Sequence, residues 1–211
     1  MESTGSKYLD ENIGGFKNGE ITMIYGPPAS GKTTICLLIS SLLSTLGKKV
    51  IYIDTEKSFS VERIAQLHKE NCMEALKNIL ILKADDFDKQ HIFTKKLLKE
   101  NFDLLVIDSL TNNYRQCDKK IDANKIMAVH LKDISQIARE KNIPVLCTGQ
   151  VYTDLDSGSF QIVGGNMLKN WSKCLIRLEK DEERRMLIEK HETAPKKTLH
   201  FNITEKGIEG S

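Results

Sequence analysis

A glycine-rich segment near the amino terminus constrains the fold of this chain more than any other feature. It reads GPPASGKTT, and four residues separate Gly26 from Gly31-Lys32-Thr33, which matches the form G-x-x-x-x-G-K-[ST] at every defined position. An apolar run, residues 21–25, precedes it, and an apolar-periodic segment, residues 33–46, follows it. This pattern between an expected strand and an expected helix predicts a nucleotide-binding loop, the Walker A motif, rather than a glycine turn with a chance lysine.

The residue types of this loop suit a polyphosphate. Glycines let successive backbone N–H groups converge on an anion, and the helix that begins near Gly31 adds unpaired N–H groups and the positive end of its dipole. Lys32 supplies a cation for the β- and γ-phosphates, and the Thr33 hydroxyl can ligate Mg²⁺. The predicted nucleotide-binding residues of the loop are Gly26, Pro27, Pro28, Ala29, Ser30, Gly31, Lys32, Thr33 and Thr34.

Length and charge narrow the class of protein. The 211 residues are enough for one sizeable core, so we expect a single domain over residues 1–211. The net charge of +2 does not demand a nucleic-acid partner, and any basic surface must be local. The five cysteines are widely spaced without a C-x-x-C pair, which favours buried reduced thiols over disulfides or zinc. No apolar run approaches the roughly 18 residues of a membrane span, and no signal peptide is apparent. We therefore expect a soluble, cytoplasmic protein without membrane contact.

Short apolar runs alternate with longer amphipathic ones over the first 150 residues. Strands are expected at 21–25, 50–54, 79–82, 104–108 and 144–148, and helices at 32–46, 61–70, 89–100 and 122–141. This alternation predicts an α/β fold with a mostly parallel central sheet and helices on both faces. Residues 152–166 are rich in Gly, Ser and Asp without periodicity, which suggests a long exposed loop. Strand-like runs at 173–179, 185–189 and 198–203 predict a C-terminal antiparallel extension of the sheet.

Three polar residues follow strands of this sheet. The carboxyl ends of parallel strands face the ligand crevice, so Asp108 at the end of LLVID can hold Mg²⁺ through water, as a Walker B carboxylate does. Glu56 follows the second strand and can orient a water for attack on the γ-phosphate, although a helix-capping acid near Ser60 would have the same spacing. Gln150 follows the fifth strand, where a neutral amide can sense the γ-phosphate.

The segments GPPASGKTT, YIDTEKSFSVERI, LLVIDS, CTGQVY and GGNMLKNWSK occur in this order, and together they resemble the RecA/RadA recombinase superfamily. The last segment, with NNYR and EKHETAP, looks most like the archaeal paralogues of RadA. The resemblance runs from YLDENIGGFKNGEI to FNITEKGI, nearly the whole chain. It implies a RecA-type P-loop ATPase core that uses ATP and Mg²⁺.

The resemblance also implies roles for single residues. Glu56 matches the water-activating glutamate, Gln150 the switch glutamine, and Arg63 an arginine that lies against the adenine. With Lys32, Glu56 and Gln150 form the predicted catalytic set, and Thr33 and Asp108 the metal set. Two departures stand out, since Lys57 replaces a glycine beside the catalytic position and Gly149 replaces the usual asparagine. Both substitutions are expected to slow hydrolysis.

The resemblance further implies two DNA-facing loops. Residues 111–120 offer Tyr114 for stacking and Arg115, Lys119 and Lys120 for phosphates, and residues 152–166 offer Tyr152 and Phe160 with the glycines Gly164 and Gly165. Aromatic side chains with nearby cations suit single-strand binding without sequence preference. Acidic residues in the second loop and a basic set around residues 169–185 leave open whether these surfaces are ordinary solvated faces.

The expected function is an ATP- and DNA-binding accessory protein of DNA repair and homologous recombination, with weak, DNA-modulated ATPase activity. The implied partners are single-stranded or branched DNA and, among proteins, RadA, a Holliday-junction-cleaving endonuclease or a DNA polymerase. Only residues 1–7 precede the core, so no N-terminal DNA-binding domain is expected. Two alternatives remain: a KaiC-like regulatory ATPase that acts on protein partners, and an ATP-gated, non-catalytic adaptor for a recombination nuclease or polymerase.

Overall fold

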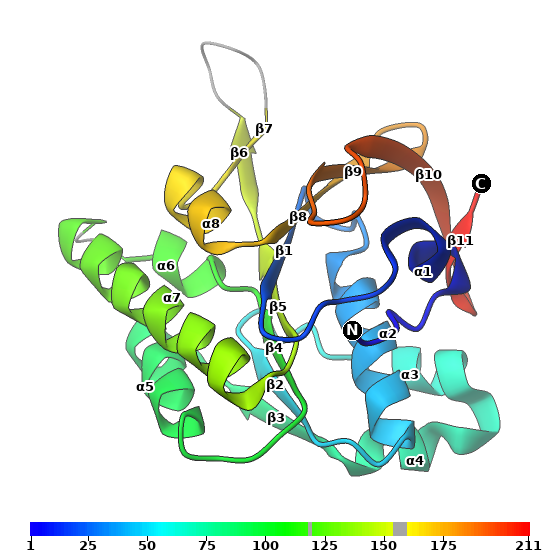
Figure 1. The fold of residues 1–211 in the computed structure, drawn as a ribbon, viewed down its shortest axis with the longest axis horizontal. Coiled ribbons are helices and arrows are strands. Elements are labelled where there is room, and N and C mark those ends of the chain that lie inside the picture. Colours follow the sequence, from blue (N-terminus) through cyan, green and yellow to red (C-terminus); the bar gives the residue numbers. More distant parts are fainter. Residues whose placement is uncertain (118–119, 154–159) are drawn as a thin grey trace.

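A central sheet organises the molecule, whose computed structural model describes residues 1–117, 120–153 and 160–211. Within these ranges nine strands pair in the order β11-β10-β9-β8-β1-β5-β4-β2-β3 (Figure 1). The six strands from β8 to β3 in this order are parallel, and β9, β10 and β11 continue the sheet in antiparallel fashion. The strands are β1 (Ile21–Tyr25), β2 (Val50–Asp54), β3 (Ile79–Lys83), β4 (Leu104–Asp108), β5 (Val145–Gly149), β8 (Cys174–Lys180), β9 (Arg184–Lys190), β10 (Lys197–Thr204) and β11 (Gly207–Gly210).

Helices cover both faces of this sheet. Figure 1 shows α2, α3 and α4 on one side and α5, α6 and α7 on the other. Two apolar clusters, one per face, form the core between these layers. The helices are α1 (Lys7–Ile13), α2 (Lys32–Thr45), α3 (Val61–His68), a 3₁₀ turn (Lys69–Asn71), α4 (Cys72–Lys77), α5 (Phe87–Leu97), α6 (Asn112–Arg115), α7 (Lys120–Lys141) and α8 (Gly165–Trp171).

The central strands are buried over their whole length. Every residue of β1, β2, β4 and β5 is buried, because helices lie above and below these strands. This double coverage explains why the sequence shows continuous apolar runs there instead of alternation. The α/β prediction, with its parallel centre and antiparallel C-terminal extension, is confirmed.

The loop expected at residues 152–166 was wrong for its two ends, and residues 154–159 lie outside the described residues. β6 (Val151–Thr153) and β7 (Phe160–Ile162) form a separate two-stranded antiparallel sheet, and α8 begins at Gly165. The short strands escape a periodicity search because each spans three residues. In Figure 1 this hairpin extends beyond the end of the central sheet, next to α8.

Candidate nucleotide site

The glycine-rich loop joins β1 to α2, and two of its glycines pack so closely against neighbouring atoms that a side chain would obstruct the contact. A Cβ on Gly26 would lie 2.3 Å from the Leu178 carbonyl oxygen, and a Cβ on Gly31 would lie 3.0 Å from Ile203 Cδ1. Gly31 also has φ 111° and begins α2 without a side-chain cap. The first N–H groups of α2 are therefore left for an anion.

The inner side of the loop holds polar groups that suit phosphate oxygens. The Ser30 hydroxyl is buried and has no hydrogen-bond partner among the described residues. The Lys32 ammonium donates to the carbonyls of Gly26 and Pro27 at 2.9 and 2.8 Å, which places it within the curve of the loop. Burial lowers the pKa of Lys32, and the nearby carboxylates of Asp108 and Glu56 oppose this shift. A buried cation beside a partnerless hydroxyl fits a polyphosphate.

Around these groups, Pro28 and Ala29 form the exposed tip of the loop, and Thr34 lies half-buried in the first turn of α2.

The Asp108 carboxylate is buried at the end of β4 and accepts hydrogen bonds from four hydroxyls. Thr33 and Tyr52 donate at 2.7 and 2.8 Å, Ser58 at 3.2 Å, and Thr148 also donates. Burial and the adjacent carboxylate raise the pKa of the Tyr52 phenol, so this hydroxyl stays a donor. The structure thus brings together the two predicted Mg²⁺ residues, Thr33 and Asp108, and an acceptor-rich carboxylate beside a hydroxyl suits that ion.

Glu56 follows β2 in a turn that Asp54 holds. The Asp54 carboxylate accepts from the backbone N–H groups of Glu56, Ser58 and Phe59 at 3.1 to 3.2 Å. Lys57, in the same turn, has φ 56°. This left-handed conformation favours glycine, which accounts for the glycine that the resemblance places at this position.

A hydrogen-bonded network joins the ends of β2, β4 and β5. The Glu56 Oε1 atom accepts from the Ser109 hydroxyl at 2.6 Å and from Gln150 Nε2 at 2.9 Å. The Gln150 backbone N–H donates to Thr111 Oγ1, and Arg115 donates to Gln150 Oε1 at 3.4 Å. Glu56 does not cap α3, because the Ser60 hydroxyl does so by accepting from the Arg63 N–H. The predicted water-activating carboxylate and the predicted switch amide are therefore in contact.

The Arg63 side chain crosses from α3 to the C-terminal strands. Its guanidinium donates to the Thr204 carbonyl at 2.6 Å and to Gln66 at 2.9 Å. Ile203, which precedes Thr204, is the residue whose side chain lies closest to Gly31. The predicted adenine residue thus contacts β10, the strand whose Ile203 side chain faces Gly31 of the phosphate loop.

The first predicted DNA loop contains the short helix α6. The Tyr114 ring packs edge-on against Phe87, with ring centroids 5.8 Å apart, and its hydroxyl donates to Asn124. Tyr114 is therefore held against α5 and α7, and stacking on a base would compete with this packing. Lys119 and the side chain of Lys120 lie outside the described residues.

The second predicted DNA segment presents its two aromatic residues on different faces. Tyr152 pairs with Gln161, and Thr153 pairs with Phe160. Because side chains alternate along a strand, Tyr152 and Phe160 point to opposite faces of the hairpin. Both are exposed, at 50% and 41% of their surface, so they form two separate contact points and no common platform.

The glycines after the hairpin shape the start of α8. Gly164 has φ 90°, and a Cβ there would lie 3.0 Å from Leu168 Cδ1. Gly165 has φ 53° and is the first helical residue. Both positions need the backbone freedom of glycine, whether or not they touch DNA.

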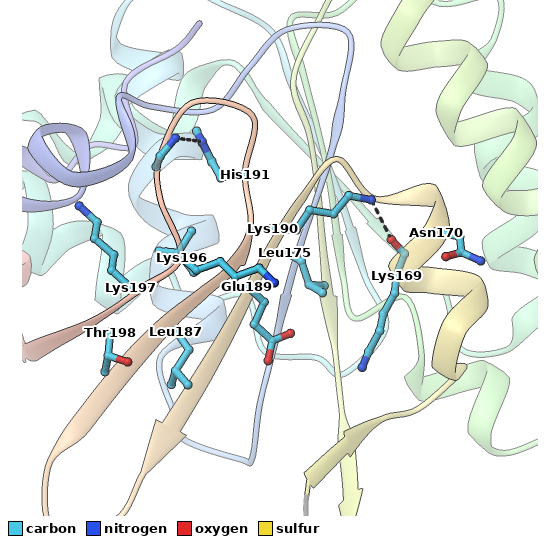
Figure 2. Close-up of a pocket in the computed structure, with 12 residues that line it drawn as sticks. Lys169, Asn170, Leu175, Leu187, Glu189, Lys190, His191, Lys196, Lys197 and Thr198 are labelled. Atoms are coloured by element: carbon cyan, nitrogen blue, oxygen red, sulfur yellow. Dashed lines mark hydrogen bonds between the residues drawn. The ribbon is translucent and has the colours of Figure 1, made fainter.

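A basic hollow of about 850 Å³ lies away from the phosphate loop, between α8, the start of β8 and the turn after β9 (Figure 2). Figure 2 shows the Lys190 ammonium reaching the Lys169 carbonyl and the Glu189 carboxylate among the lysines. Nearby, Arg177 pairs with Glu179 and Glu189, and Arg185 pairs with Glu179 and Asp181. The basic set around residues 169–185 is thus partly balanced by acidic side chains.

Several residues of the site were missed by the sequence pattern. They are Tyr52, Asp54, Ser58, Ser109, Thr148 and Ile203. One signal was available, since β2 and β4 both end in an aspartate followed by a hydroxyl residue, DT and DS. The other contacts come from separate elements and leave no local pattern.

Comparisons with known proteins show the family and the fold of this chain. The model of the Rad51 family matches residues 1–211. A DNA repair and recombination protein RadB from Methanocaldococcus jannaschii is 39% identical over 93% of this chain and 96% of its own. A RadB from Methanococcus maripaludis strain C7 is 40% identical over 95% of this chain and 97% of its own. The crystal structure of a RadB recombinase matches with a TM-score of 0.83 and 37% identity, covering all of both chains. The resemblance to the archaeal RadA paralogues and the RecA-type fold are confirmed.

Proposed function

Because this chain belongs to the Rad51 family, we propose that it is an ATP- and DNA-binding accessory protein of homologous recombination and DNA repair, with weak ATPase activity. One observation carries this proposal: Glu56, Asp108 and Gln150 meet at the carboxyl ends of three parallel strands, beside the glycine loop. The names of the RadB relatives support the cellular role. In the described ranges no helix combines the length and apolar character needed to cross a bilayer. We propose a cytoplasmic location.

Each residue of the site has a proposed task. The loop N–H groups and Lys32 hold the β- and γ-phosphates of ATP, and Thr33 and Asp108 hold Mg²⁺, which neutralises charge on the phosphate oxygens. Glu56 orients the attacking water and accepts its proton. Gln150 senses the γ-phosphate, and Arg63 borders the adenine. Lys32 remains charged when it faces phosphate, because the anion offsets the cost of burial.

Three features support slow hydrolysis. Two donors already bind Oε1 of Glu56, so a water can bind this oxygen only by displacing one of them. Lys57 adopts a left-handed backbone beside it, which costs an ordinary residue about 1 kcal/mol. Gly149 lies directly under Ile162 of the hairpin, since a Cβ at Gly149 would lie 3.3 Å from Ile162 Cδ1. The absent asparagine side chain is therefore replaced by hairpin packing.

Single-stranded or branched DNA is the proposed partner. Arg115 is exposed on α6, and the hairpin that carries Tyr152 and Phe160 follows directly from Gln150. A side chain that contacts the γ-phosphate is thus adjacent in sequence to the aromatic residues that would contact bases. Phosphate contacts by cations and stacking by aromatics are the usual means of binding single strands.

The deciding experiment titrates labelled oligothymidylate at several salt concentrations, with ATP and with ADP. We expect binding that weakens with salt, because released counterions drive it, and that differs between the two nucleotides. Undetectable DNA binding at low salt, with ATP binding intact, would contradict the DNA role and favour the KaiC-like alternative.

A further inference from the structure

The Gln150 side chain contacts two charged side chains from separate segments, the exposed Arg115 on α6 and Glu56 after β2. Its side-chain oxygen accepts from the Arg115 guanidinium at 3.4 Å. Its side-chain nitrogen donates to Glu56 Oε1 at 2.9 Å and to Asn112 Oδ1 at 3.5 Å. One amide thus bridges a surface cation and the proposed catalytic carboxylate.

Arg115 and Glu56 favour the same orientation of this amide. A guanidinium has only donors, so the Gln150 atom that faces Arg115 must be the oxygen. The nitrogen is then left for Glu56 and Asn112. Asn112 presents its own oxygen because its side-chain nitrogen donates to the Thr55 carbonyl at 2.9 Å. All three side-chain contacts of Gln150 require the same orientation, in which its NH₂ group donates a hydrogen bond to Glu56.

In this orientation the Gln150 amide is bonded to Glu56 and is not available to a γ-phosphate. To contact a γ-phosphate, the Gln150 amide must leave Glu56, and the contact with Arg115 opposes that movement. We propose that Arg115 is a positioning residue that restrains hydrolysis: it holds Gln150 on Glu56 until a phosphate group binds the guanidinium. This inference rests on the proposed ATPase function and adds its regulation.

The hydrogen bond between Arg115 and Gln150 can be replaced by a bond to a stronger acceptor. Arg115 is exposed and offers Gln150 a single bond to a neutral amide. A phosphodiester carries a full negative charge and can accept two hydrogen bonds from the same guanidinium, so it binds Arg115 more strongly than a single neutral amide oxygen does. A DNA backbone at α6 would therefore take Arg115 from Gln150, which frees the amide and one of the two occupied acceptor sites on Glu56 Oε1.

Steady-state kinetics of Arg115→Gln tests the restraint. Without DNA, we expect kcat to rise by about fivefold, the factor that corresponds to one hydrogen bond of about 1 kcal/mol. KM for ATP should not rise, because Arg115 is not among the residues proposed to hold ATP. Oligothymidylate should raise kcat of the wild type and add little to that of the variant. In a Gln150→Ala background, Arg115→Gln should have no further effect, as a double-mutant cycle requires.

Controls separate the restraint from a general effect. Arg139→Gln makes the same charge change at an exposed position of α7 and should leave kcat as in the wild type. Arg115→Lys keeps one donor and should restore most of the restraint. Equal or lower turnover of Arg115→Gln without DNA, compared with the wild type, would overturn the proposal.

A second readout needs no ATP. The side-chain amide resonance of Gln150 in ¹⁵N-labelled, nucleotide-free protein should shift, and its hydrogens should exchange faster, in Arg115→Gln. An unchanged resonance would overturn the inference even if the protein hydrolyses ATP. A wild type that neither binds nor hydrolyses ATP would instead contradict the proposed function, while the resonance still tests the Arg115 contact.

Discussion

The Thr33 hydroxyl donates a 2.7 Å hydrogen bond to the Asp108 carboxylate and so joins the first turn of α2 to the end of β4. The two residues are 75 positions apart in the chain. In P-loop proteins these two positions hold the magnesium ion of the nucleotide. Their direct contact means that the two proposed metal ligands, one from each element, lie within hydrogen-bonding distance of each other.

This pair predicts the metal dependence of nucleotide binding. Asp108→Asn removes the charge, so the gain in ATP affinity on adding Mg²⁺ should fall by at least about tenfold, or about 1.4 kcal/mol. Tyr52→Phe is the matched control, because it removes a donor to the same carboxylate but leaves the charge. Titrations of ATP with Mg²⁺ and with EDTA measure both. A gain in Asp108→Asn equal to that of the wild type would exclude Asp108 as a metal residue.

Lys32→Ala should weaken binding of a fluorescent ATP analogue by about 10- to 150-fold, since a hydrogen bond to a charged group contributes about 1.5–3 kcal/mol. The fold should persist, because the described hydrogen bonds of the ammonium go only to two carbonyls of its own loop. Lys99→Ala, at an exposed position, should bind like the wild type. Unchanged affinity in Lys32→Ala would refute the phosphate role.

Glu56→Gln should keep ATP binding but lose hydrolysis by roughly 10²–10⁴-fold, the usual contribution of a general base. Because the Glu56 carboxylate already accepts two hydrogen bonds, we expect a loss near the lower end of that range. Single-turnover kinetics compares the variant with the wild type and with the exposed control Glu100→Gln. Turnover of Glu56→Gln at the wild-type rate would show that another group activates the water.

Phe160→Ala should weaken oligothymidylate binding in every nucleotide state, by roughly 1–3 kcal/mol, if a base stacks on this ring. The ring is exposed, so stability should change little. Met73→Ala, an exposed apolar residue on α4, is the matched control. Because Tyr152 lies on the other hairpin face, its replacement by alanine reports a separate contact. Fluorescence anisotropy that is unchanged for Phe160→Ala would remove that face from the DNA surface.

Buried His130 predicts a loss of stability in acid. Burial, reinforced by His91, lowers its pKa to about 3, and its Nε2 forms a 2.8 Å hydrogen bond with Thr94 Oγ1. In the unfolded chain a histidine has a pKa of about 6.5, so between about pH 3 and pH 6.5 the unfolded state binds more protons than the folded state. The free energy of unfolding therefore decreases as the pH drops below about 6.5. At pH 5 the loss should be about 2 kcal/mol.

Urea unfolding at pH 7 and pH 5 measures this loss. His130→Gln should reduce it by about the same 2 kcal/mol, because glutamine does not titrate in this range. His200→Gln, an exposed histidine on β10, should leave it as in the wild type. An equal loss in His130→Gln would assign the acid sensitivity to other groups.

The sequence by itself determined the scaffold and the phosphate end of the site. The strands at 21–25, 50–54 and 104–108 coincide with β1, β2 and β4. Strands that are buried on both faces are mostly apolar along their length, so the sequence alone predicts them without any knowledge of their neighbours. The Walker A loop is equally local, because its turn, its lysine and its hydroxyl lie within one short segment that carries its own backbone requirements.

Only the tertiary structure decided how the remaining groups are used. Glu56 and Gln150 are 94 positions apart, and no local pattern could show that the Gln150 amide donates to the Glu56 carboxylate and accepts from Arg115. The same holds for Tyr114, which the pattern offered for stacking and which packs on Phe87. Hydrogen bonds and ring contacts of this kind depend on where separate elements end relative to one another. That placement follows from packing of the whole core, to which every element contributes at once.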